Sequence, residues 1–317
     1  MKINKIRPLE HIFTKRLKTL ALIPKMLYFY GKLPEISNDS LFGETGNRGR
    51  PRSVAIVGSR KNTVYGKEVA YKAAYEAAKA GAVVISGLAY GIDSVAHRGA
   101  LDAGGVTVAV LGTPIDQIYP REHSGLAKEI IEKGGAVISE YGPGSSADSG
   151  TEIKTRFLAR NRLIAALSDV VLITEAAARS GTLNTAMHAL DNGVDLMATP
   201  GDITKLSSEG CNRLISQGAI PYLGPDGLLD LLFPGRLTKK KSRKKDLELE
   251  IEQQLAHFAE TEVERKVLKQ ILTGVRDGDE IIEELGISAA EFGQMVTILE
   301  IKGAIKPLGM NQWVSGK

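Results

Sequence analysis

A glycine-containing turn early in the chain carries the residue types that bind phosphate. Gly58, Ser59 and Arg60 follow a short apolar run, Val54–Val57, that is typical of a buried parallel strand, and a helical pattern begins near Tyr65. Such a strand–turn–helix unit presents backbone amides and a helix dipole to an anion. The guanidinium of Arg60 adds bidentate geometry for a phosphate. The turn lacks the further glycines of the dinucleotide fingerprint GxGxxG, so it predicts a phosphate-bearing ligand without identifying it.

A second turn of this kind contains Ser180, Gly181 and Thr182, between another predicted strand and helix. Its hydroxyls and amides would form a second anion cradle, although plain N-capping explains the same residues. Glu175, a few positions earlier, suits a sugar-hydroxyl acceptor, a catalytic acid or a structural partner. Two cradles on one sheet edge favour a ligand with several phosphates over a single nucleotide.

The densest mixture of cations and an aromatic side chain lies between the two cradles, at residues 154–162. Lys154, Phe157 and Arg160 are spaced i, i+3 and i+6 in a predicted helix. Cations can follow a phosphate backbone while an aromatic face stacks on bases, at about 1–3 kcal/mol per base. Alternatively, the arginines pair with carboxylates elsewhere and Phe157 is a core anchor. The pattern alone favours neither.

Asp93 and His97 are four residues apart and would share one helix face, as two metal ligands or an acid–base pair would. No third ligand is nearby in the sequence, and no serine stands in a G-x-S-x-G elbow. We therefore expect structural roles, with Asp93 capping its helix and His97 hydrogen-bonded close to the core. We expect no metal, no cofactor and no catalytic residue.

These residues depend on alternating strands and helices between Ser53 and about Phe233. The predicted strands are Val54–Val57, Val83–Ser86, Val106–Leu111, Ala136–Ser139, Val170–Thr174, Leu196–Ala198 and Ile220–Leu223. The predicted helices are Tyr65–Ala80, Ser94–Ala103, Ser124–Lys133, Thr182–Asn192 and Asn212–Gln217. Repeated βαβ units predict an α/β, Rossmann-like, doubly wound and mainly parallel sheet with ligands at its carboxyl edge.

The organisation along the chain is predicted as follows. Residues 1–50 form a small appendage and link, in which Leu27–Tyr30 suggests an edge strand; residues 51–233 form the Rossmann-like domain. Residues 234–258 are predicted to be a linker, basic at Lys239–Lys245 and then acidic, and residues 259–317 a small winged helix. Its third helix, Ser288–Gly303, offers only Lys302 as a cation, which favours a protein contact or weak DNA binding over duplex readout.

Composition narrows the class of protein. The chain has 317 residues, 43% of them hydrophobic, and a net charge of +4, which by itself predicts no nucleic acid. Cys211 is the only cysteine, so no internal disulfide can form. No apolar run is long enough for a membrane span and no export signal is evident, so we expect a cytoplasmic protein with no membrane partner.

Taken together, these segments resemble the DprA family, also called Smf, bacterial DNA-processing proteins of natural transformation. The resemblance covers about residues 24–233 and, more loosely, the winged helix. It rests on ordered blocks at Ile56–Arg60, Ser86–Asp93, Ala109–Tyr119, Arg160–Ile164, Glu175–Leu183 and Gly210–Ala219. It implies a non-catalytic, dimeric protein that binds and protects single-stranded DNA and helps to load the recombinase RecA.

The family's pocket residues fall on Gly58, Ser59, Arg60, Lys154, Phe157 and Arg160, and this match favours a base contact for Phe157. Three positions depart from the family pattern. Tyr90 stands where many members carry Arg or Lys, Leu158 replaces a usual proline, and His123 replaces a usual asparagine. Tyr90 could thin the charge of the pocket or add a stacking face.

Two other functions remain open. One is a phosphoribohydrolase-like enzyme on the same fold that uses Glu175 and the Ser180–Thr182 cradle, although Ala178-Arg179-Ser180 lacks the usual glycine pair. The other is duplex reading by the winged helix, which its few cations disfavour. The main expectation is that the protein is a recombination mediator that binds single-stranded DNA.

Overall fold

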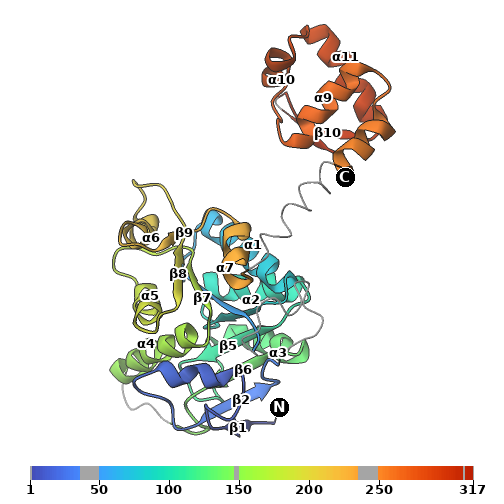
Figure 1. Cartoon of the computed structure of the whole chain (residues 1–317). Coiled ribbons are helices and arrows are strands. Elements are labelled where there is room, and N and C mark those ends of the chain that lie inside the picture. Colours follow the sequence, from blue (N-terminus) through green and yellow to red (C-terminus); the bar gives the residue numbers. More distant parts are fainter. Residues whose placement is uncertain (1, 36–49, 146–149, 235–248, 310, 317) are drawn as a thin grey trace. The chain divides into compact units, whose positions relative to one another are not determined.

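A computed structural model describes residues 2–35, 50–145, 150–234, 249–309 and 311–316. The chain divides into two compact units, Met1–Arg236 and Leu237–Lys317 (Figure 1). The predicted basic segment Lys239–Lys245 lies outside the described residues. Among the residues that are described, no helix is both long and apolar enough to cross a membrane.

The first unit is built on a nine-stranded sheet with the order β1-β2-β6-β5-β4-β3-β7-β8-β9. Its strands are β1 (Asn4–Ile6), β2 (Leu27–Gly31), β3 (Ser53–Val57), β4 (Val83–Ser86), β5 (Thr107–Leu111), β6 (Ala136–Ser139), β7 (Val170–Ile173), β8 (Asp195–Ala198) and β9 (Ile220–Pro221). The strands from β3 to β9 pair in parallel, whereas β1 and β2 are antiparallel to their neighbours. The predicted doubly wound α/β sheet is therefore confirmed.

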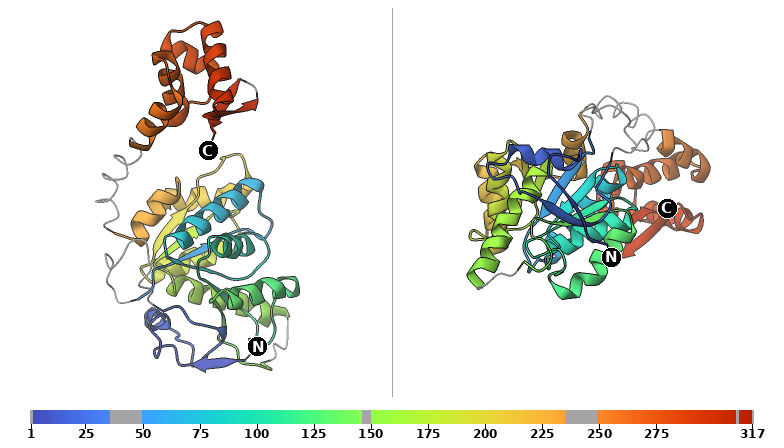
Figure 2. Two further views of the ribbon diagram at one scale, coloured as in Figure 1. Left: turned by 90° about the vertical axis from the view of Figure 1, so that its right-hand side faces the viewer. Right: turned by 90° about the horizontal axis from the view of Figure 1, so that it is seen from below.

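Helices cover both faces of this sheet. They are α1 (Val64–Lys79), α2 (Ile92–Asp102), α3 (Ser124–Glu132), α4 (Gly150–Ala166), α5 (Thr182–Asp191), α6 (Leu206–Ser216) and α7 (Pro225–Leu232), with short 3-10 helices η1 (Thr14–Thr19) and η2 (Arg121–His123). One core lies between the sheet and η1, α4, α5 and α6; the other face packs against α1, α2, α3 and α7. The two layers are separated in Figure 1, and the left view of Figure 2 brings the α1–α2 layer forward.

The central strands are buried on both faces, which explains their unbroken apolar sequences. Every residue of β3, β4, β5, β6 and β7 is buried. Residues alternate between the two cores along each strand: Ala55 and Val57 pack on one side of the sheet, Val54 and Ile56 on the other. Small residues on both helices let α1 lie close to α2. The buried residues of α1 are mostly alanines, and Gly99 of α2 lies where a side chain would collide with the Tyr71 carbonyl.

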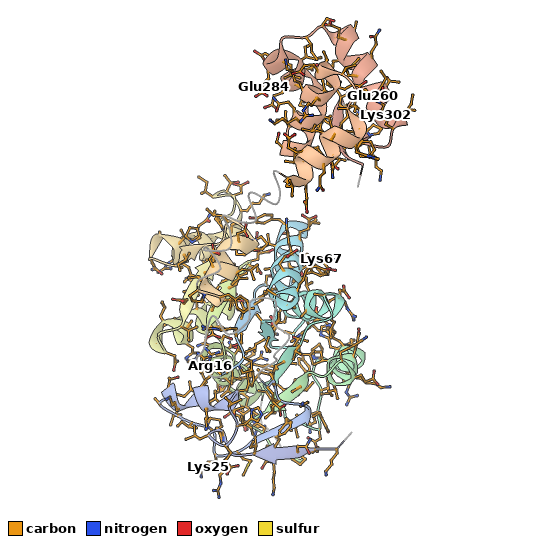
Figure 3. All side chains as sticks on the ribbon, turned by 45° about the vertical axis from the view of Figure 1, so that its right-hand side comes forward. Arg16, Lys25, Lys67, Glu260, Glu284 and Lys302 are labelled. Carbon is orange, nitrogen blue, oxygen red and sulfur yellow. The ribbon has the colours of Figure 1, made fainter. Side chains whose placement is uncertain are left out.

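The N-terminal segment is part of this unit. Leu27–Tyr30, predicted as an edge strand, lies in β2 between β1 and β6, so that prediction of an edge position is wrong. Arg16, which is labelled in Figure 3, is held between the segment and the sheet, where it pairs with Asp169 at 3.1 Å and donates to the Leu167 carbonyl at 2.8 Å. Phe13 and Leu17 enter the main core. Because a 3-10 helix lacks the 3.6-residue periodicity of an α-helix, the hydrophobic pattern of the sequence does not reveal this packing.

The second unit is a winged helix, as predicted. It contains α9 (Glu262–Thr273), α10 (Gly278–Leu285) and α11 (Ala289–Ile301), followed by the hairpin β10 (Ile305–Gly309) and β11 (Gln312–Ser315). A capping box of Ser288 and Glu291 begins α11, the helix predicted at Ser288–Gly303. Residues 249–258, which lie in the predicted linker, are helical, and Leu255 is fully buried in the core of this unit.

Candidate nucleic-acid interface

The two predicted cradles meet at one point of the sheet. β3 lies next to β7, and successive strands run outward from this pair in opposite directions. Such a topological switch point opens a crevice at the carboxyl edge of the sheet, where ligands of doubly wound folds bind. The Thr182 hydroxyl donates to the Gly58 carbonyl at 3.1 Å, so the turn after β7 is tied to the turn after β3. The predicted clustering of Gly58–Arg60 with Ser180–Thr182 therefore has direct geometric support.

The second cradle is partly occupied by its own side chains. The Ser180 hydroxyl accepts from the Thr182 amide at 3.2 Å, and Asn161 donates to the Gly181 carbonyl at 3.4 Å. Gly181 itself is exposed and is the N-cap residue of α5. The hydrogen bond between Ser180 and Thr182 thus explains part of the Ser-Gly-Thr pattern, and the exposed face of the turn is what remains for a ligand.

Arg60 and Phe157 form the centre of the site. The exposed guanidinium of Arg60 lies over the half-buried Phe157 ring, 5.7 Å from its centroid, in a cation–π contact. Gly112, at the end of β5, allows this position, because a side chain there would collide with Phe157. The Tyr119 ring lies on Phe157 with 5.5 Å between centroids. A cation and two aromatic rings are therefore presented together at the carboxyl edge.

Lys154 is exposed one turn before Phe157 on α4. The helix rises by about 4.5 Å over the three residues between the two positions, so both can contact one extended ligand. This part of the prediction agrees with the observed helix. Leu158, which replaces the proline usual in the family, is exposed within α4, which begins at Gly150, well before it.

Arg160 does not lie where a direct phosphate contact requires it. Its side chain is 4% exposed and donates to the carbonyl of Gly87 at 2.8 Å and to that of Val110. Burial, opposed by the nearby charge of Asp93, lowers the pKa of Arg160 to about 10, and the guanidinium stays charged. This corrects the predicted role. Arg160 fixes the turn after β4 and the carboxyl end of β5, because the missing side chain of Gly87 leaves room for its guanidinium.

The turn that carries Ser59 and Arg60 is held by Gly91. This glycine has φ of +76°, and a side chain there would lie 2.3 Å from the Ser59 carbonyl oxygen. We expect Gly91→Ala to destabilise the protein by at least about 1–2 kcal/mol, because L-residues resist this backbone region. Urea unfolding measures the loss. Gly104→Ala is the matched control: it also has positive φ but nothing within 4 Å, and equal losses would mean that contact with the turn is unimportant.

Asp93 and His97 have the structural roles predicted for them, with one difference. Asp93 is buried and accepts from the amides of Gly87 and Ala89, at 3.1 and 3.4 Å, instead of capping α2. His97 Nδ1 lies 2.7 Å from the Thr107 hydroxyl, which itself donates to the Val84 carbonyl. Nδ1 must therefore carry the proton. No group of three or more metal-ligating side chains occurs in the described part of the chain.

Burial lowers the pKa of His97 to about 3. The folded protein keeps this imidazole neutral, whereas the unfolded chain protonates it below pH 6.5, so stability is lost as the pH falls from about 6.5 toward 3. We expect His97 to contribute up to about 1.4 kcal/mol per pH unit in that window. Urea unfolding across this pH range should give a shallower dependence for His97→Asn than for wild type. Identical slopes would contradict the assignment.

Glu175 is a structural partner. It is 4% exposed and accepts from both the amide and the hydroxyl of Thr63, each at 2.9 Å. Thr63 in turn caps α1 by accepting from the Gly66 amide. The carboxylate thus joins the turn after β7 to the start of α1. This engagement disfavours Glu175 as the catalytic group of a phosphoribohydrolase-like enzyme.

Sequence reasoning missed Gly112 and Tyr119 as site residues. Both fall in the block Ala109–Tyr119, which carried the family resemblance but no assigned role. A signal was present, since a glycine directly after a buried strand marks a close approach at the carboxyl edge. What approaches it, Phe157 of a distant helix, depends on tertiary packing.

The fold and the site define a class: a Rossmann-like domain whose switch point presents a cation beside two aromatic rings, linked to a winged helix. The profile of the family described as DNA recombination-mediator protein A matches residues 4–232, and that of the DprA winged helix domain matches residues 252–309. The chain belongs to the DprA family of DNA-processing proteins.

Three relatives show the extent of the similarity. The chain is 42% identical over 179 residues to Protein Smf of Escherichia coli K12, 37% over 255 residues to a putative DNA processing protein DprA of Mycobacterium tuberculosis H37Rv, and 42% over 181 residues to DNA processing protein DprA of Streptococcus pneumoniae R6. These matches cover 56%, 80% and 57% of the chain, but only 46%, 62% and 62% of the relatives.

Two solved structures have the same fold. DprA of Streptococcus pneumoniae matches with a TM-score of 0.60 and 35% identity, over 72% of this chain and 74% of that one. DNA processing protein A of Helicobacter pylori, whose structure is described in terms of its single-stranded DNA binding mode, matches with a TM-score of 0.60 and 31% identity, over 73% and 96%.

Proposed function

We propose that this protein binds single-stranded DNA at the switch point of its sheet, protects it, and helps to load RecA during natural transformation. The observation that carries the proposal is the contact of the Arg60 guanidinium with Phe157, beside the tied turns after β3 and β7. Positive charge for phosphates and an accessible ring for a base are what single-strand binding requires.

The roles of individual residues follow from their positions. We assign phosphate binding to Arg60, Lys154 and the turns Gly58–Arg60 and Ser180–Thr182, and one stacked base to Phe157. Arg160 acts through the backbone that it holds. No catalytic step or cofactor enters the proposal. The family resemblance supports this ligand, and so does the single-stranded DNA binding mode described for the Helicobacter pylori relative.

RecA loading, the homodimer and a cytoplasmic location belong to the proposal through the family resemblance. The winged helix fits a protein partner better than a duplex. Its segment 249–317 has twelve acidic and seven basic residues. Lys302, the cation at the end of α11, is engaged by Glu260 at 3.1 Å and Glu264 at 3.3 Å; Glu260 and Lys302 are labelled together in Figure 3.

The test of this proposal follows a labelled single strand through two steps. In the first, added protein should slow digestion of the strand by a nuclease. In the second, it should shorten the delay before RecA forms filaments on the strand. Failure of both, with a folded protein, would overturn the mediator function. Release of free base from nucleoside monophosphates would instead establish the enzyme alternative.

A further inference from the structure

The carboxyl edge presents more exposed aromatic surface than one base on Phe157 requires. Tyr119 is 48% exposed and Tyr90 is 42% exposed, although large aromatic side chains usually bury most of their area. Tyr90 lies in the loop after β4 and Tyr119 in the loop after β5. Because β4 is next to β3 and β5 is next to β4, both loops lie on the same edge as Arg60.

Four rings in two contacting pairs make up what is here called the aromatic strip: Phe157 with Tyr119, and Tyr90 with His123. Phe157 and Tyr119 have centroids 5.5 Å apart, and Tyr90 and His123 have centroids 5.1 Å apart. Tyr90 and Tyr119 lie in the loops that follow the neighbouring parallel strands β4 and β5. Arg60 lies at the Phe157 end.

The far end of the strip is held in place through His123. The neighbouring Glu122 carboxylate raises the pKa of Tyr90. His123 Nδ1 donates to the Leu88 carbonyl at 2.7 Å, which fixes the ring against which Tyr90 rests. Rings that are positioned before a ligand arrives lose little entropy when they bind it. The departures at positions 90 and 123 thus lie side by side and support each other.

We propose that Tyr119 and Tyr90 are stacking subsites that continue from Phe157, so that a single strand lays consecutive bases along the aromatic strip. This inference rests on the proposed function. A duplex keeps its bases stacked inside and offers the strip no free face, whereas every unpaired base has one. The carboxylate of Glu122 repels phosphate at the far end, so the strip holds about two bases beyond the one on Phe157.

The experiment measures binding of oligothymidylates of increasing length to the full chain. Tyr119→Leu and Tyr90→Leu keep apolar bulk but lose the π-face. Each substitution should lower the affinity for long oligonucleotides by about 5- to 100-fold and leave the affinity for the shortest oligonucleotide that binds unchanged. The dependence on salt should not change, because no phosphate contact is lost. Tyr119→Phe should bind as wild type does.

Tyr71→Leu is the matched control, since Tyr71 is also an exposed tyrosine, on α1, with its own ring contact to Tyr75 and a hydrogen bond to Asp102. If Tyr119→Leu and Tyr90→Leu bound long oligonucleotides as tightly as this control does, the proposed stacking subsites would be refuted. An equal loss at every length would also refute them, since it would mean that Tyr119 only supports Phe157. Absence of binding by the wild type would instead refute the proposed function. If Phe157→Ala lowered the affinity but neither tyrosine variant did, the proposed function would stand and the strip would be refuted.

Discussion

Replacing Arg60 by alanine is expected to weaken binding of single-stranded DNA by about 10- to 100-fold without loss of folding. A charge-assisted hydrogen bond to phosphate contributes about 1.5–3 kcal/mol, and the Arg60 side chain is exposed, so its removal leaves no buried group unpaired. Lys154→Ala should cause a smaller loss, because a single ammonium lacks the bidentate geometry of a guanidinium. Fluorescence anisotropy at one fixed salt concentration measures both.

Lys128→Ala is the control for the loss of one positive charge. Lys128 is exposed on α3 and pairs with Glu132, within the same helix. Its replacement should leave the affinity within a factor of about two. If Arg60→Ala and Lys128→Ala bind equally well, net charge and not a site at the switch point would explain any binding.

Replacing Arg160 by methionine is expected to lower the free energy of unfolding by about 3 kcal/mol. The substitution leaves two buried carbonyls, of Gly87 and Val110, without their donor, and leaves the Asp93 carboxyl without the nearby positive charge. Burial already raises the pKa of Asp93, so this carboxyl should take up a proton more readily in the variant. Urea unfolding measures the loss.

The double variant Arg160→Met, Asp93→Asn separates the two causes. Since asparagine carries no charge, the double variant should recover part of the stability if the unpaired carboxylate matters. A fully stable Arg160→Met protein with impaired DNA binding would contradict the positioning role and restore the predicted phosphate contact.

Much of the fold could be predicted because the signals were local. The strands β3 to β7 are buried on both faces, so each reads as a short apolar run between turns. The cradle residues Gly58 and Thr182 were found for the same reason, since each follows a strand and precedes a helix. That the cradles meet follows from the topology, which places β3 beside β7.

The predictions that were wrong or missing concern features that depend on contacts between distant segments. An arginine at position 160 has the same helical spacing whether its side chain faces a ligand or the core. Its burial depends on the space that Gly87, which has no side chain, leaves for the guanidinium. α7 escaped prediction, and β9 ends at Pro221, two residues earlier than expected. α6 begins at Leu206, more than a turn before the prediction, because its exposed first turn lacks a repeating apolar face.

The most direct test of the central claim compares a labelled oligothymidylate with its duplex by fluorescence anisotropy across a salt series. Wild type should prefer the single strand, with an affinity that falls as salt rises, since phosphate contacts release counterions. In Arg60→Ala the slope of log affinity against log salt should be shallower by about 0.7, the value for one lost phosphate contact on a single strand. Equal binding of both strands, or a slope unchanged in Arg60→Ala, would contradict a single-strand site at the switch point.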